Sequence, residues 1–244
     1  MNPIQVIINR ELSSLFSTSV AYVFIFIFLV MAGVCTFVFG NLYENDHADL
    51  SVFFSFHPWL YLFFVPAIAM RSWAEERRNG TIELLLTLPL TTNSIVIGKF
   101  IALWIVLLVC LILTLPIWLT VNYLGAPDNG IILAAYFGSW LMSGAFLSVS
   151  MCFSALTKNQ IVALISSIFC CFLFVLIGSP LLQNLLSTSA PVWLLDTVSN
   201  FSFLAHYQDL ARGLISLNSL IFYVVTIVVF LVASRMIIDM KKAS

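Results

Sequence analysis

The densest group of charged side chains in this sequence runs from Arg71 to Glu83. It reads RSWAEERRNGTIE and mixes both signs of charge within a few helical turns. Side chains of this kind form ion pairs with another protein, or they merely keep one face of a helix in water. The first interpretation makes the segment a binding surface for a soluble partner, and the charge pattern alone leaves both interpretations open.

The residues needed for catalysis or nucleotide binding are not grouped anywhere in the sequence. A phosphate-binding loop has the pattern GxxxxGK[ST], which does not occur, and Gly98-Lys99 is followed by Phe100. His57 and His206 each lack a second nearby ligand, so hydrogen bonding within the protein is the favoured role for both. The five cysteines lie in apolar stretches without a CxxC pair. We predict no catalytic residue, metal site or cofactor, and the chain is not expected to be an enzyme.

The elements that carry the charged segment are expected to be membrane helices. Hydrophobic residues make up 61% of the 244 positions and charged residues only 9%, whereas about a quarter of a soluble domain is charged. Six stretches of more than 20 residues contain no charge, and these are 12–43, 50–70, 100–127, 129–157, 159–195 and 213–234. Each can hold the ~20 apolar residues of a helix that crosses a bilayer. A net charge of −1 gives no support for binding to nucleic acid.

We predict an all-α polytopic membrane protein that forms a single transmembrane domain over 1–244 and begins with an amphipathic interface helix at 1–19. Six spans are expected at 20–40, 55–72, 96–122, 131–156, 159–179 and 217–237. In this arrangement Arg212 is the one basic residue on the side opposite the termini. Because cytoplasmic loops carry the excess of Lys and Arg, both termini are expected in the cytoplasm.

The stretch 181–216 is too apolar for a free loop and needs a separate interpretation. A seventh span there would place Arg235, Lys241 and Lys242 on the outer side, against the charge rule. Gly178, Pro180 and Pro191 supply breaks in the helical structure before and within it. We therefore expect outer-leaflet re-entrant segments, which enter and leave the membrane on the same side and lean on protein.

Several side chains in the spans have expected places. Trp59, Tyr61 and Trp193 are expected as interfacial anchors at the outer headgroups. Lys99 is placed at the cytoplasmic mouth of the third span, and no buried charge is expected within any span, which disfavours transport driven by protons or sodium. Small polar residues such as Ser139 either line an inner surface or pack helices together, and both roles stay open.

The cytoplasmic coupling segment at 73–90 is expected to form an elbow between the second and third spans. Asn79-Gly80 is a helix-stop pair, because both residues tolerate the left-handed conformation. A short helix is expected at 81–88, and Pro89 ends it. Residues 91–93, Thr-Thr-Asn, can cap the helix that follows.

Two stretches resemble the membrane subunits of ABC-2 type transporters, particularly the gliding-motility-associated permease branch. The first is EERRNGTIELLLTLP at 75–89, followed by Gly98-Lys99-Phe100. The second is FLAHYQDLARGLI at 203–215, before the last span. The resemblance extends over essentially the whole chain.

The resemblance implies a permease of six spans, expected to be an exporter, in a bacterial inner membrane. It further implies two copies of a separate ABC ATPase subunit and a second membrane subunit, identical or similar. The element that couples the chain to the ATPase would comprise Glu75, Glu76, Arg77, Arg78, Gly80, Thr81 and Glu83. The outer segment that caps the pathway would include His206, Asp209, Arg212 and Gly213.

Two other functions are alternatives to export. In the first alternative, the chain transmits ATP-driven force to a periplasmic or cell-surface partner without moving cargo. The gliding-type resemblance keeps this alternative open. An intramembrane protease of the prenyl-protein-processing type requires an EExxxR pattern, whereas Glu75-Glu76 is followed by Gly80 at the position of the arginine. The protease function is therefore disfavoured.

Overall fold

A computed structural model of the chain describes residues 3–40, 50–81, 91–179 and 200–242, and all regular elements in these ranges are helices. They are α1 (Pro3–Ser17), α2 (Ser19–Val34), the π-helix η1 (Cys35–Phe39), α3 (Ser51–Ser55), α4 (His57–Ala69), α5 (Arg71–Asn79), α7 (Thr92–Ile112), α8 (Leu115–Leu124), α9 (Asn129–Leu156), α10 (Gln160–Leu176), α13 (Phe203–Ala211) and α14 (Leu217–Lys242). The predicted all-α class is confirmed.

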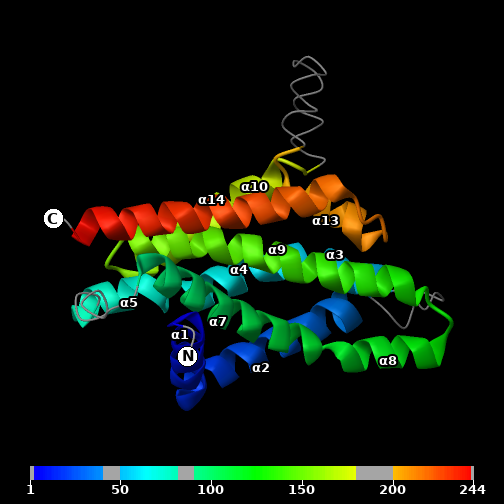
Figure 1. The fold of residues 1–244 in the computed structure, drawn as a ribbon. Coiled ribbons are helices and arrows are strands. Elements are labelled where there is room, and N and C mark those ends of the chain that lie inside the picture. Colours follow the sequence, from blue (N-terminus) through cyan, green and yellow to red (C-terminus); the bar gives the residue numbers. More distant parts are fainter. Residues whose placement is uncertain (1–2, 41–49, 82–90, 180–199, 243–244) are drawn as a thin grey trace.

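Helix α9 lies at the centre of the bundle. It contacts α4, α5, α7, α10, α13 and α14, and α14 runs beside it along most of its length (Figure 1). Several of its buried positions are small, and Ser139, Ser143, Ser148 and Ser150 are fully buried. At Gly138 a Cβ atom would come within 2.7 Å of the Leu210 side chain. Small side chains let helices approach closely, so the serines of α9 pack helices together.

Four helical stretches of the described residues are long and apolar enough to cross a membrane. They are Ala21–Phe39, Thr92–Leu124, Asn129–Leu156 and Leu217–Lys241. The predicted span at 159–179 contains the shorter apolar helix α10, and the span predicted at 55–72 contains α4, which has 13 residues. Apolar helices therefore lie in all six places, whereas the number that cross a membrane stays a prediction.

Two of the predicted spans are interrupted. The second is divided at Phe56 and at Met70 into α3, α4 and α5. The third is divided between α7 and α8, and α8 carries a proline in its first turn. A proline has no N–H to donate and favours the start of a new helix, which explains the division between α7 and α8.

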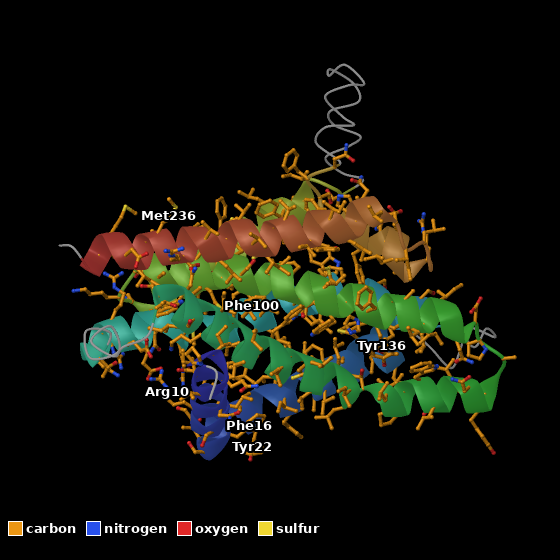
Figure 2. All side chains as sticks on the ribbon, viewed as in Figure 1. Arg10, Phe16, Tyr22, Phe100, Tyr136 and Met236 are labelled. Atoms are coloured by element: carbon orange, nitrogen blue, oxygen red, sulfur yellow. The ribbon has the colours of Figure 1, made fainter. Side chains whose placement is uncertain are left out.

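Helix α1 crosses the direction of the long helices and packs on α7 (Figure 1). The close approach depends on Gly98 of α7, because a Cβ atom there would lie 2.7 Å from Cγ2 of Ile7. At the corner between α1 and α2, the rings of Phe16 and Tyr22 meet edge to face at 5.8 Å (Figure 2). The helix expected at 1–19 is thus formed, and one face of it contacts protein.

One predicted anchor is wrong. Tyr61 is 1% exposed, and its hydroxyl forms a hydrogen bond of 2.8 Å with Oγ of Ser139. A tyrosine whose hydroxyl has a partner can be buried in the core, and the bundle supplies that partner. Trp59 is 44% exposed, as an anchor requires. Trp193 lies outside the described residues.

The predicted helix ends around the elbow are confirmed where the structure describes them. Gly80 follows α5 with φ of 71°, in the left-handed region. Thr91 caps α7 by accepting a hydrogen bond from the Ser94 amide. Glu83 and the rest of the helix expected at 81–88, apart from its first residue, lie outside the described residues.

Candidate coupling site

Lys99 of α7 is a buried cation between three helices. Its side chain is 3% exposed, and Nζ donates to Oε1 of Glu76 at 2.8 Å and to the Ser72 carbonyl at 3.1 Å. Oε1 of Glu11, on α1, lies 3.3 Å from the same Nζ. The ammonium group also lies 5.0 Å from the centre of the Trp73 ring. Buried charges need such partners, and this one has them on α1 and α5.

Lys99 corrects an expectation from the sequence. It belongs to the span predicted at 96–122, where no buried charge was expected, and the burial of its side chain makes that expectation wrong. Burying a lysine costs free energy because its ammonium group leaves water. The carboxylates of Glu11 and Glu76 offset most of that cost at Lys99.

Arg10 completes a group of four charges with Glu11, Glu76 and Lys99, which we call the four-charge cluster. Its Nη2 donates to Glu11 and lies 3.8 Å from Glu76. Arg10 projects from α1 toward the end of the bundle where α5 lies (Figure 2). Burial raises the pKa of Glu11, but the nearby Lys99 and Arg10 outweigh it, so the pKa lies below its usual 4.5. Glu11 therefore keeps its negative charge near neutral pH, beside Lys99 and Arg10.

A second set of contacts ties α5 to the end of α9. Nη1 of Arg77 donates to the Ala155 carbonyl at 2.8 Å, and Nζ of Lys241 donates to the Leu156 carbonyl at 2.6 Å. Cations are favoured at the C-terminal end of a helix, where carbonyl groups lack partners within the helix. Helices α5 and α14 therefore meet at this end of α9.

Ser154 of α9 shapes the junction between α4 and α5. Its hydroxyl donates to the Met70 carbonyl at 2.9 Å and accepts from the amides of Trp73 and Ala74, both at 3.1 Å. A side chain that enters the hydrogen-bond ladder of a helix in this way interrupts the helix. The direction in which α5 leaves α4 is thus set by a residue of α9.

The residues predicted to form the coupling element fall into two groups in the structure. Glu76 and Arg77 have partners on other helices, as described above. Arg78, Gly80 and Thr81 are exposed, Glu75 is half-buried, and Glu83 lies outside the described residues. The hydroxyl of Thr81 donates to the Glu76 carbonyl at 3.3 Å, which closes the end of α5. The segment thus has an outer tip and an anchored inner face.

The predicted outer-segment residues lie at the opposite end of the bundle, on and after α13 (Figure 1). The His206 ring is hydrogen-bonded through Nδ1 to Oγ of Ser219 at 3.0 Å and through Nε2 to the Asn200 carbonyl at 2.9 Å. This agrees with the hydrogen-bonding role favoured for it. Asp209 is half-buried and Arg212 is exposed.

The turn after α13 is closed by Gly213, whose φ is 82°. Only a glycine adopts this conformation without strain, so the residue shapes the chain between α13 and α14. Residues 180–199 of the expected re-entrant segments lie outside the described residues.

Sequence reasoning missed Arg10, Glu11 and Ser154 as parts of the site. A signal did exist for two of them, because a lysine next to an apolar span needs an acidic partner, and Arg10-Glu11 is the nearest charged pair outside the elbow on the same side of the predicted membrane. Ser154 has no comparable signal among the many serines of α9.

These features define a polytopic membrane protein whose charged contacts are concentrated at one end. A comparison with protein-family models matches residues 21–239 to the ABC-2 family transporter proteins, and the chain belongs to that family. Members are membrane subunits of ABC transporters without an ATPase domain of their own, so a separate ABC ATPase is their partner. The search among curated proteins gave no match.

Proposed function

We propose that this chain is the permease subunit of an ABC-2 type exporter. Two membrane subunits would form the transport unit in a bacterial inner membrane, with both termini in the cytoplasm. Two copies of a separate ATPase would bind the elbow at 73–90, and ATP hydrolysis there would drive a substrate across the membrane. The family membership supports the type of transporter, and the geometry of α5 supports the place where the two proteins meet.

The observation that carries this proposal is the double attachment of α5. Its exposed tip ends at Gly80, while its inner face is tied through Glu76 to Lys99 of α7 and through Arg77 to the end of α9. Hydrogen-bonded ions and packed helices move together, so a displacement of the tip would reach α1, α7 and α9 at once. A partner that changes shape on hydrolysis would thereby act on the membrane helices.

The structure suggests a division of roles within the predicted coupling element. Arg78, Gly80 and Thr81 would contact the ATPase, because they are exposed at the tip. Glu76 and Arg77 would transmit the displacement inward, because their side chains already have partners on other helices.

Co-purification of the tagged chain with its ATPase tests the contact surface. We expect Arg78→Glu to reduce the recovery of the ATPase at least about tenfold, because it places a repulsive charge in a contact. Arg212→Glu is the matched control, since Arg212 is an exposed arginine at the other end of the bundle. Equal recovery from both variants, with both chains folded, contradicts the assignment of the tip.

Stimulation of ATP hydrolysis tests the transmitting residues. We expect Glu76→Gln to leave the ATPase bound and to reduce stimulation of its activity by the reconstituted chain, because the ion pair with Lys99 is lost. Normal stimulation in this variant would show that the Glu76–Lys99 pair is structural only.

A further inference from the structure

A cavity of about 270 Å³ opens beside the four-charge cluster, between α1, the α4–α5 junction and α7. Its charged lining comprises Glu11, Arg71, Glu75, Glu76 and Lys99. The size suits a small polar group rather than a whole drug-sized molecule. Neither the family match nor the proposed coupling role explains why the cavity is there.

Along each of the three walls of the cavity, formed by α7, by α1 and by α4 with α5, the lining changes from charged to apolar within one helical turn. On α7 the step is from Lys99 to Leu103, and on α1 it is from Glu11 to Leu15. On the third wall, Ile68 of α4 lies one turn before the charged start of α5. The three apolar side chains share one cavity with the charged ones, so its occupant is expected to be amphiphilic. In a membrane protein the abundant amphiphile is a lipid.

Some charged groups of the cavity lack partners among the described residues. Oε2 of Glu76 is buried and accepts no hydrogen bond. Glu75 and Arg71 form no ion pair with the described part of the chain. Lys99, by contrast, is already used by Glu76, Glu11 and a backbone carbonyl. Glu75 and Glu76 can therefore accept hydrogen bonds from a cation, and Arg71 can donate hydrogen bonds to an anion.

We propose that this cavity binds the headgroup of a zwitterionic phospholipid with a primary amine, such as phosphatidylethanolamine. The ammonium group donates to Oε2 of Glu76 and to Glu75, and the phosphate receives hydrogen bonds from Arg71. The glycerol end of the lipid lies against Leu15 and Ile68. The lipid would join α1 to the start of α5.

The same groups discriminate between headgroups. A trimethylammonium headgroup has no N–H to satisfy the buried Glu76 oxygen, so phosphatidylcholine is a poorer ligand. An anionic headgroup such as that of phosphatidylglycerol brings no cation to a cavity lined by three carboxylates. The site thus favours a small headgroup that carries both charges.

Native mass spectrometry of the full-length chain tests the proposal, and it needs no ATPase. The chain is exchanged into bilayers that contain equal amounts of phosphatidylcholine, phosphatidylethanolamine and phosphatidylglycerol, and the retained lipid is counted. We expect retention of phosphatidylethanolamine to exceed that of either other lipid by about tenfold, which corresponds to ~1.4 kcal/mol. Equal retention of the three lipids would overturn the proposal.

Two variants locate the lipid without touching the cluster that holds the helices together. Arg71→Ala and Glu75→Gln are each expected to lower retention of phosphatidylethanolamine severalfold, whereas Arg235→Ala, an exposed arginine on α14, leaves it unchanged. Unchanged retention in both cavity variants overturns the location. Soluble glycerophosphoethanolamine is added as a competitor, and displacement of the lipid at equimolar concentration would overturn the choice of a lipid over a free amine. Loss of ATPase binding in the Arg78 variant bears on the proposed function alone.

Discussion

The two ends of the helical bundle are joined by different chemistry. At the end that carries α5, the four-charge cluster links α1, α5 and α7 through ion pairs. The end that carries α13 lies opposite (Figure 1), and there hydrogen bonds between neutral groups link the helices. The hydroxyl of Tyr207 donates to the Phe54 carbonyl at 3.0 Å, and that of Tyr223 donates to the Phe203 carbonyl at 2.8 Å.

The difference concerns how each end responds to a change. A neutral hydrogen bond contributes only about 1 kcal/mol net, so the loss of one leaves its neighbours in place. A buried ion that loses its partner costs about 3–5 kcal/mol, because the remaining charge is left without water or a counter-ion. At the charged end, the loss of one charged side chain therefore destabilises the contacts of the other three. At the neutral end, the loss of one hydrogen bond leaves the others in place. A joint of the first kind suits the end where we propose that a partner acts.

The largest expected effect is at Lys99. Lys99→Met leaves two carboxylates facing each other in a buried place, and we expect a loss of about 3–5 kcal/mol in the free energy of unfolding. The measurement is denaturant unfolding of the purified chain in mild detergent. Lys158→Met, at an exposed lysine, is the control.

A combined variant separates lost charge balance from lost packing at Lys99. Adding Glu11→Gln and Glu76→Gln to Lys99→Met removes both unpaired anions and is expected to restore most of the stability. If the triple variant is no more stable than Lys99→Met alone, electrostatics is not what holds this end.

Gly98→Ala is expected to have the next largest effect, about 1–3 kcal/mol, because the new methyl group meets Ile7 at 2.7 Å and pushes α1 away from α7. Gly33→Ala is the matched control, since no atom lies within 4 Å of a Cβ placed there and alanine is a better helix former. Thermal unfolding of the two variants gives the comparison. Ile7→Ala in the Gly98→Ala background should recover stability, and a further loss would refute the steric explanation.

At the neutral end, Tyr207→Phe is expected to cost about 1 kcal/mol, because it removes one hydrogen bond and leaves the ring packed. Tyr123→Phe is the control, at a tyrosine that is 92% exposed. The same unfolding assay applies. A loss as large as that of Lys99→Met would erase the contrast between the two ends.

The smallest effect is a dependence on pH at the charged end. The pKa of Glu11 is lower in the folded chain than its usual 4.5, so its contribution to stability is present above pH 4.5 and is lost as pH falls through the folded value. The stability difference between the native chain and Glu11→Gln should therefore shrink on acidification below pH 4.5. A constant difference from pH 7 to pH 3.5 would show that Glu11 is not held by its cations.

The sequence was sufficient where structure depends on neighbours along the chain. Gly80 could be placed because a left-handed helix end needs such a residue, and Thr91 because its side chain caps the amide of a residue three positions later. The apolar helices could be placed because long stretches without charge have few other structures open to them.

The rest depends on contacts between distant segments. Tyr61 looks like an anchor until Ser139 is known to face it, and Lys99 looks like a surface lysine until α1 and α5 bring their glutamates to it. No pattern within 55–72 announces the division at Met70, because the group that interrupts the helix is the Ser154 hydroxyl from α9. The predicted coupling residues lie together, but which of them face inward could be read only from the packing.

The hydroxyl of Ser154 also has a mechanical consequence. Helix α5 has nine residues and is about 14 Å long, and Ser154 holds the backbone at its base while Glu76 and Arg77 tie its inner face to α7 and α9. A rotation of about ten degrees at this pivot moves the far tip by roughly 2 Å, given that length. A small swing of the tip is thereby converted into a twist at the base of α5, where α4 ends.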